Sequence, residues 1–339
     1  MSAFISDNVS GIHPTILDAI SKANFGSELP YGFDQWSMQL NSDFSDLFET
    51  PVLVIPCTSG TAANCLALSL MVEPINSIFV HERSHIFLDE STAPELFTGG
   101  ARLSPLSGAD SKIDLASLEQ AMDTIGAMHS AQPGALSLTQ STETGSVYRI
   151  DEITQLTKTA KDRGLRTHMD GARFANAIAA LDCSPAELTW KAGIDALSFG
   201  ATKNGAMAAE AVILFKPDLY KSAPYRQKRS GQLLSKQRFL AAQLLAYLKD
   251  DLWLVNARTA NQKTRNMATA LANIDGVILP EQVTTNMMFV KFTDAQVQRL
   301  QKHDLAGYVY ANGSMRLCCS WASKESDIAQ FIDCVSSAT

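Results

Sequence analysis

The sequence has no apolar run long enough to cross a membrane. Its longest helix-like stretch, around residues 240–254, is interrupted by Lys249, Asp250 and Asp251. The N-terminus lacks the basic start and the apolar segment of a signal peptide. We therefore expect no membrane partner and a cytoplasmic location.

The six cysteines do not form a metal-binding or disulfide pattern. No two of them are spaced as C-x-x-C, and none has a histidine at metal-ligand spacing. Reduced, mostly buried thiols are the interpretation we prefer. The sequence therefore predicts no metal site.

The chain also lacks an excess of positive charge. It has 28 Lys and Arg against 35 Asp and Glu, a net charge of -7, so nothing attracts nucleic acid or an anionic membrane surface. Internal repeats and low-complexity linkers are missing too. The 339 residues, of which 46% are hydrophobic, suffice for one large core and a smaller second domain.

Short apolar runs alternate with helix-like segments over the first two thirds of the chain. The predicted strands are Val52–Ile55, Ile78–Val80, Ala135–Leu138, Leu165–Met169, Ile194–Phe199 and Ala211–Phe215. A helical pattern follows the first of them, and another helix is expected from an N-cap at Asp151 to a stop at Gly164. This rhythm predicts an α/β fold, a mostly parallel sheet with helices on both faces.

The last third of the chain has a different pattern. Residues 231–274 are helical in character, and two strand-like segments, 283–292 and 314–319, precede a last helix near 324–336. We expect a large domain over residues 1–250, which includes an N-terminal arm, and a small C-terminal α+β domain over residues 251–339.

Polar residues follow the predicted strands at the edge where open parallel sheets bind ligands. Ser59, Gly60 and Thr61 come after the first strand and open a helix, so their free N–H groups and hydroxyls could cradle a phosphate. An ordinary helix N-cap explains the same residues.

Asp170 and Lys203 each follow a predicted strand and lie 203 − 170 = 33 residues apart, one β-α-β step. A carboxylate there could hold a protonated pyridine nitrogen, and Lys is the side chain that forms a Schiff base with an aldehyde cofactor. Arg173 could contact the ring hydroxyl or a substrate carboxylate. An N-cap aspartate with a salt-bridge partner and a solvated lysine are the alternatives.

Arg316 lies on a predicted strand of the small domain. Facing the cleft, it could clamp a carboxylate by two hydrogen bonds, whereas on an edge strand it would be a surface residue. The combination is more specific than its parts. A phosphate cradle, a carboxylate and a lysine, in that order and each at a strand end, together predict a pyridoxal 5'-phosphate (PLP) site.

Several segments then resemble the PLP-dependent threonine aldolase family, which belongs to the fold type I, aspartate aminotransferase-like group. Residues 4–15 resemble its S-D-x-V-x-x-P-T opening, and residues 31–34 its Y-G-x-D segment. Residues 59–64 resemble its S-G-T-x-x-N loop, residues 85–90 its H-I-x-x-x-E segment, and residues 168–173 with Lys203 its cofactor positions.

The resemblance implies a seven-stranded, mostly parallel sheet and a role for each matching residue. PLP would be bound by Ser59, Gly60, Thr61, His85, Asp170, Arg173, Lys203 and Arg229. The substrate would be bound by Ser6, Tyr31, Arg173 and Arg316, and catalysis would use Lys203, His85, His129 and Glu90. Tyr31 would reach the site of a neighbouring subunit, and Arg229 would offer a phosphate contact there, so a homodimer or homotetramer with shared active sites is expected.

Two segments depart from the family pattern. Where many members read E-N-T-H, residues 140–143 read Gln-Ser-Thr-Glu, and where many have a Gly-rich stretch with Met-Arg-Gln, residues 231–237 differ. These departures bear on substrate preference rather than on the cofactor.

The expected reaction is cleavage of the Cα–Cβ bond of L-threonine or L-allo-threonine to glycine and an aldehyde, with L-phenylserine as the alternative substrate. A base must remove the β-hydroxyl proton, and His85, His129 and Glu90 acting through water all stay open. The rival reactions are β-elimination, transamination and racemisation, since one cofactor supports all of them. A non-catalytic binding protein would leave the pairing of Asp170 with Lys203 unexplained.

Overall fold

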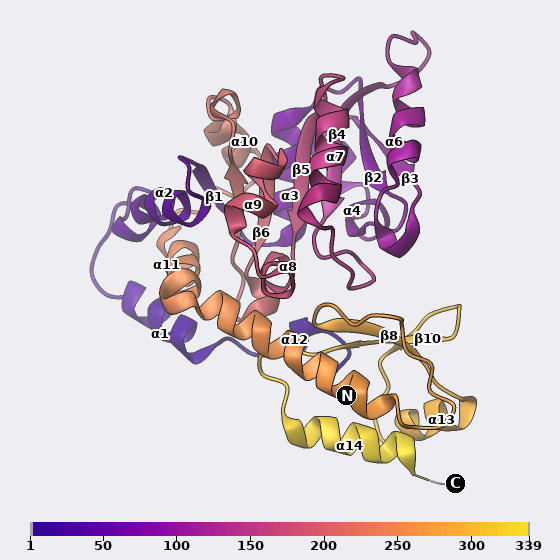
Figure 1. Ribbon diagram of the computed structural model, residues 1–339. Helices are drawn as coiled ribbons and strands as arrows, with labels where there is room; N and C mark the ends of the chain where they lie inside the picture. Colours follow the sequence, from indigo (N-terminus) through magenta and orange to yellow (C-terminus); the bar gives the residue numbers. More distant parts are fainter. Residues whose placement is uncertain (1–2, 338–339) are drawn as a thin grey trace.

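A seven-stranded sheet forms the centre of the computed structural model, which describes residues 3–337 (Figure 1). Its strands are β1 (Leu53–Cys57), β2 (Asn76–His81), β3 (Arg102–Leu106), β4 (Gln132–Thr139), β5 (Arg166–Gly171), β6 (Ala196–Gly200) and β7 (Glu210–Leu214). Their order is β1-β7-β6-β5-β4-β2-β3, and only β7 runs antiparallel to its neighbours. The predicted mostly parallel sheet is confirmed.

Helices cover both faces of this sheet. The longer ones are α1 (Pro14–Ala23), α2 (Gln35–Phe48), α3 (Gly60–Met71), α7 (Ile150–Lys161), α8 (Phe174–Leu181), α11 (Arg238–Leu248) and α12 (Leu252–Leu271). The shorter ones are α4 (His85–Leu88), α5 (Ala93–Thr98), α6 (Leu115–Ala121), α9 (Pro185–Leu188) and α10 (Ala223–Arg229).

Alternate residues of the strands serve different cores, as the two-residue period of a strand requires. Leu197 and Ile213 pack into the core shared with α2, α7, α8 and α11. Ala196 and Val212 pack into the core shared with α3 on the opposite face. Because β6 and β7 are buried along their whole length, they read as continuous apolar runs in the sequence.

Two local expectations differ from the structure. The N-cap of α7 is Arg149, whose backbone N–H donates to Glu152, and Asp151 lies in the first turn instead. A carboxylate one or two residues further in still suits the positive helix end. Strand β3 was not predicted, because its solvent-facing edge carries Arg102 and Pro105, which break the apolar run.

A second, antiparallel sheet lies below the first, with the order β8-β10-β9 (Figure 1). It consists of β8 (Met287–Lys291), β9 (Tyr308–Val309) and β10 (Ser314–Cys318), and it is accompanied by α13 (Asp294–Lys302) and α14 (Glu325–Ser336). Its core includes Phe4, whose carbonyl accepts a hydrogen bond from the backbone of Cys318 at 2.8 Å. The N-terminal segment therefore crosses from the small sheet to the large one, while the division near residue 250 stays a prediction.

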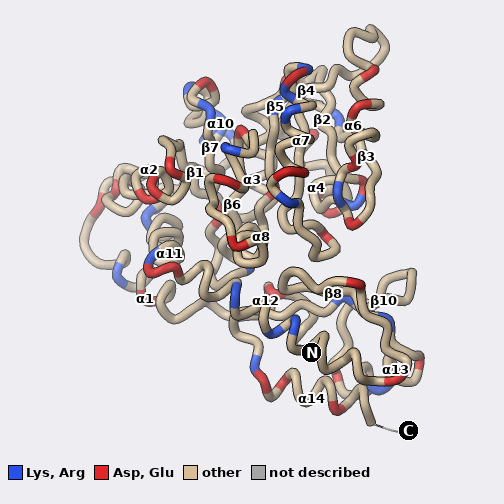
Figure 2. Tube along the Cα trace, in the orientation of Figure 1, with Lys and Arg blue, Asp and Glu red and all other residues tan. Residues whose placement is uncertain are grey.

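Basic and acidic residues are both spread along the whole Cα trace (Figure 2). Within residues 3–337, no helix has both the length and the apolar character needed to span a membrane.

Candidate active site

A cavity of about 590 Å³ opens at the carboxyl edge of the large sheet, on the side that faces β8–β10. It is lined by nine of the predicted site residues: Ser6, Gly60, Thr61, His85, Glu90, Asp170, Arg173, Lys203 and Arg316. The parallel strands and the small sheet thus bring together side chains from most of the chain's length.

A chain of hydrogen bonds runs along the back of the cavity from Asp170 to His85. Asp170 accepts the backbone N–H of Ala172 at 3.0 Å and the side-chain amide of Asn64 at 3.0 Å. The same Asn64 nitrogen donates to Glu90 at 2.9 Å, and Glu90 lies 3.0 Å from Nδ1 of His85. Asn64, in the first turns of α3, therefore links the two carboxylates.

His85 holds a proton more firmly than an isolated histidine. Its hydrogen bond with Glu90 raises its pKa above the usual value; burial opposes this effect, and the negative charge of Asp170 adds to it. This raised pKa favours the protonated form of the His85 ring over the neutral form.

Lys203 lies in a 3₁₀ turn, Thr202–Asn204, just after β6. Burial lowers the pKa of its ammonium group, and the charge of Arg173 lowers it further, against the opposing pull of Asp7, Asp170 and Glu210. A lysine with a lowered pKa is a better amine nucleophile at neutral pH, as Schiff-base formation requires.

The N-terminus of α3 faces the same cavity through Gly60 and Thr61. The hydroxyl of Ser59 accepts the backbone N–H of Ala62 at 3.2 Å and so caps the helix. The first N–H groups of a helix have no partner within it, and the space that a Cβ on Gly60 would occupy is open. An anion can therefore approach this backbone closely.

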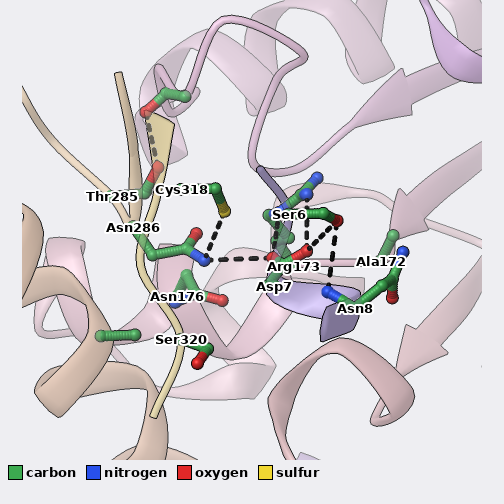
Figure 3. Close-up of polar contacts among 12 residues, drawn as sticks. Ser6, Asp7, Asn8, Ala172, Arg173, Asn176, Thr285, Asn286, Cys318 and Ser320 are labelled. Carbon is green, nitrogen blue, oxygen red and sulfur yellow. Dashed lines mark hydrogen bonds and ion pairs between the residues drawn. The ribbon is translucent and has the colours of Figure 1, made fainter. Parts of the chain in front are cut away.

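Arg173 is paired in a way that the sequence did not suggest. Its Nε and Nη2 donate to the two carboxylate oxygens of Asp7 at 2.7 and 3.0 Å (Figure 3). Asn286 donates to Asp7 as well, at 3.1 Å. This edge of the Arg173 guanidinium is therefore occupied by Asp7, while Arg173 still lines the cavity, and its contact with a ligand carboxylate stays a prediction.

Arg316 has fewer of its guanidinium N–H groups engaged in hydrogen bonds than Arg173. One nitrogen donates to the carbonyl of Ile5 at 3.2 Å, and the guanidinium lies 5.3 Å from the ring centre of Tyr308. Its buried Nε has no hydrogen-bond partner among the described residues. Arg316 can therefore still bind a carboxylate in the cavity.

Two carboxyl groups near the cavity were not predicted as site residues. Glu143 follows β4, lines the cavity, and accepts the backbone N–H of His85 at 2.8 Å. Glu210, on β7, accepts the backbone N–H of Ala201 at 3.1 Å. Burial raises the pKa of each to about 7. The departure from the family pattern at residue 143 was the one signal in the sequence.

Four predicted residues do not line this cavity: Ser59 caps the helix beside it, and the other three are not brought to it within one chain. Tyr31 is exposed, with Lys228 Nζ 5.2 Å from its ring centre, and Arg229 is exposed at the end of α10. His129 lies in an exposed turn before β4, at the amino edge of the sheet, whereas the cavity is at the carboxyl edge. An eight-residue strand separates the two edges by about 25 Å.

The residues present fit PLP in kind and in position. An open helix N-terminus suits its phosphate, the buried Asp170 suits its pyridinium, and Lys203 suits its aldehyde, all around one cavity. The fold and this arrangement define a PLP-dependent lyase of fold type I.

Comparisons with known proteins narrow this class. The family model described as beta-eliminating lyase matches residues 3–295. A "Low specificity L-threonine aldolase" from Pseudomonas sp. (strain NCIMB 10558) is 41% identical over 328 residues, 96% of this chain and 95% of the relative. The chain belongs to the beta-eliminating lyase family and to its threonine aldolase members.

Solved structures agree with this assignment. A threonine aldolase from Leishmania major superimposes with a TM-score of 0.91 at 26% identity, over 98% of both chains. A cystalysin from Treponema denticola that contains PLP has a TM-score of 0.70 at 14% identity, over 96% of this chain and 87% of its own, and it shares the fold.

Proposed function

We propose that this enzyme cleaves the Cα–Cβ bond of L-threonine and L-allo-threonine to give glycine and acetaldehyde. The observation that carries the proposal is that Lys203, Asp170 and Arg316 line one cavity. This cavity offers an amine for the cofactor aldehyde, a carboxylate for its ring nitrogen and a cation for the substrate carboxylate. The 41% identity to an enzyme named as a low specificity L-threonine aldolase supports the reaction.

Each side chain has a proposed part in binding. Gly60 and Thr61 bind the cofactor phosphate through the helix N-terminus that Ser59 caps, and His85 lies against the cofactor ring. Arg316 and Ser6 bind the substrate carboxylate. Arg173 shapes this end of the site through its pair with Asp7.

Bound PLP supplies an electron sink for the pair released when the Cα–Cβ bond breaks. The chain's own residues position the groups that contact the cofactor and the substrate. Asp170 is held in place by Asn64 and the backbone of Ala172, and its carboxyl group would pair with the ring nitrogen of the cofactor. Arg316 fixes the substrate carboxylate, and this orients the bond that is to break.

We also propose that the active enzyme is a homo-oligomer, a dimer or tetramer with shared sites. Tyr31, Lys228 and Arg229 form an exposed group away from the chain's own cavity. Exposed apolar side chains lie near Tyr31 in the sequence, Phe25, Leu29, Phe33 and Met38, and contact with a second subunit would bury them. In such an assembly Tyr31 and Arg229 serve the partner's site, and His129 can act only at the site of another subunit.

A cytoplasmic location is part of the same proposal. All six cysteines are free thiols, and four of them are buried, which suits a reducing compartment.

The test is the release of glycine and aldehyde by PLP-loaded protein from L-threonine, L-allo-threonine and L-phenylserine, with Lys203→Ala as the control. We expect equimolar products from the wild type and none from the variant, and relative rates then rank the three substrates. 2-Oxobutanoate and ammonia from either threonine, or phenylpyruvate and ammonia from L-phenylserine, without glycine would instead establish β-elimination and overturn the proposal.

A further inference from the structure

Glu143 lines the cavity, and only one of its two carboxyl oxygens has a hydrogen-bond partner. Its Oε1 accepts the backbone N–H of His85 at 2.8 Å, and this contact fixes the carboxyl group beside the histidine. Its Oε2 is buried and has no hydrogen-bond partner among residues 3–337. The Thr139 hydroxyl is close enough to lower the pKa of Glu143 somewhat, yet it makes no hydrogen bond of standard geometry to Oε2. A buried oxygen without a partner is costly unless a ligand satisfies it.

The carboxyl group is also able to change its protonation state near neutral pH. Burial raises its pKa, the negative charge of Asp170 raises it further, and the hydrogen bond from His85 opposes both, with a result of about 7. Groups with such a pKa are the most effective proton acceptors at physiological pH.

The other candidates for a base are less suited. Oε2 of Glu90 is also buried without a partner among the described residues, but its side chain has no exposed surface and its Oε1 accepts from Asn64 and contacts His85, so Glu90 is committed to two neighbours. The hydrogen bond with Glu90 raises the pKa of His85, and this favours the protonated ring over the free form that a base needs. His129 lies at the opposite edge of its own chain's sheet, so it could serve only the site of a neighbouring subunit.

We propose that Glu143 is the base that takes the proton from the substrate's β-hydroxyl, an inference that rests on the proposed aldol cleavage. The O–H bond breaks and its proton passes to the Glu143 carboxylate, the electron pair of that bond forms the aldehyde C=O bond, and the pair of the broken Cα–Cβ bond remains with Cα, for which bound cofactor would supply the electron sink. Cα then gains one proton to give glycine, and Glu143 gives up the one that it took, so the net change is one proton moved from the β-oxygen to Cα.

The charged groups around the cavity bear on the pH profile of this step. Besides Glu143, the negative ones are Asp89, Glu90 and Asp170, and the positive ones are Arg83, Arg173, Lys203 and Arg316, with His85 between the two sets. Among them, Asp170 acts on the pKa of Glu143 directly.

The test compares the wild type with Glu143→Gln as holoenzymes. Glutamine keeps an oxygen that can accept the His85 N–H but cannot take up a proton at the second position. We expect cleavage of L-threonine to fall about 100-fold or more, with KM changed little. The acid limb of the wild-type kcat/KM profile, centred near pH 7, should disappear in the variant.

A second reaction separates a base from a structural residue. Exchange of the glycine Cα proton in D₂O, followed by NMR, uses the cofactor and the substrate carboxylate site but involves no β-hydroxyl. We expect Glu143→Gln to keep this exchange within a few-fold of the wild type and to keep the absorbance of bound cofactor. Glu95→Gln is the matched control, since Glu95 also has a buried Oε2 without a partner but does not line the cavity. The Glu95→Gln enzyme should cleave L-threonine at the wild-type rate.

The outcomes separate this inference from the function on which it rests. If the wild type releases no glycine, the proposed function itself fails. If the wild type cleaves and Glu143→Gln cleaves equally well, Glu143 is not the base. Loss of exchange together with cleavage, or loss of cofactor uptake, would also overturn the inference, because Glu143 would then act on the cofactor site as a whole.

Discussion

Asp7 and Arg173 form a buried, two-pronged ion pair that joins the N-terminal segment to the carboxyl edge of the large sheet. The two residues are 166 positions apart, and both carboxylate oxygens are engaged, at 2.7 and 3.0 Å. Asn286, the residue just before β8, also donates a hydrogen bond to Asp7. The pair thus ties together the three parts of the chain that surround the cavity (Figure 3).

Removing one member of this pair should destabilise the protein strongly. Asp7→Asn leaves the Arg173 charge buried without a counter-ion, which typically costs about 3–5 kcal/mol. The free energy of unfolding of the holoenzyme in denaturant measures this loss. Asp18→Asn removes an exposed partner of Lys22 and should change stability by less than about 1 kcal/mol. Equal effects of the two variants would contradict the argument.

The same pair makes stability depend on acid. Burial alone would raise the pKa of Asp7, but the charges of Arg173 and Lys203 outweigh it and lower the value from 3.8 to about 2. A depressed carboxyl pKa gives stability that is present above the unfolded value and is lost as pH falls through the folded one. Between pH 5 and 2, the wild type should lose about 2 kcal/mol that Asp7→Asn does not. Parallel losses in denaturant unfolding of both proteins would refute this.

The charge state of His85 should depend on Glu90. Because their hydrogen bond is the largest cause of the raised His85 pKa, Glu90→Gln should lower that pKa towards the ordinary histidine value. An NMR titration of the His85 ring, assigned with a His85→Gln variant, measures the change. Glu95→Gln should leave the titration where it is in the wild type. A pKa that stays raised in Glu90→Gln would show that Asp170 is the controlling charge.

Arg316 should contribute to substrate affinity through its planar guanidinium. Arg316→Lys replaces a two-pronged donor with a single ammonium, and the loss of one charged hydrogen bond, worth about 1.5–3 kcal/mol, should raise KM for L-threonine about 10- to 100-fold. Steady-state kinetics measure this, with the exposed Arg265→Lys on α12 as control. An unchanged KM would assign the carboxylate to another residue.

Shared sites predict complementation between two inactive variants. Tyr31→Ala and Lys203→Ala, each inactive alone, should regain about a quarter of wild-type activity after they are unfolded together, mixed in equal amounts and refolded as a dimer. The reason is that half the dimers are mixed and each mixed dimer has one intact site. If mixing restores nothing, Tyr31 does not serve a partner's site.

The sequence alone determined the framework of this protein. The β-α-β rhythm and the polar residues at strand ends predicted the parallel sheet, and they also predicted where Ser59, Asp170 and Lys203 would gather. These features are local, because apolar runs define strands and the carboxyl ends of parallel strands meet at one edge. The likeness to known segments then supplied Ser6 and His85.

Only the tertiary structure decided how these groups are paired. The link from Asp7 to Arg173 spans 166 residues and the link from Asp7 to Asn286 spans 279, and no local periodicity encodes a contact of that length. The burial of individual side chains is likewise decided only by the folded structure. It lowers the pKa of Lys203 and raises that of Glu143, because a charge withdrawn from water is less stable than its neutral form unless a partner compensates.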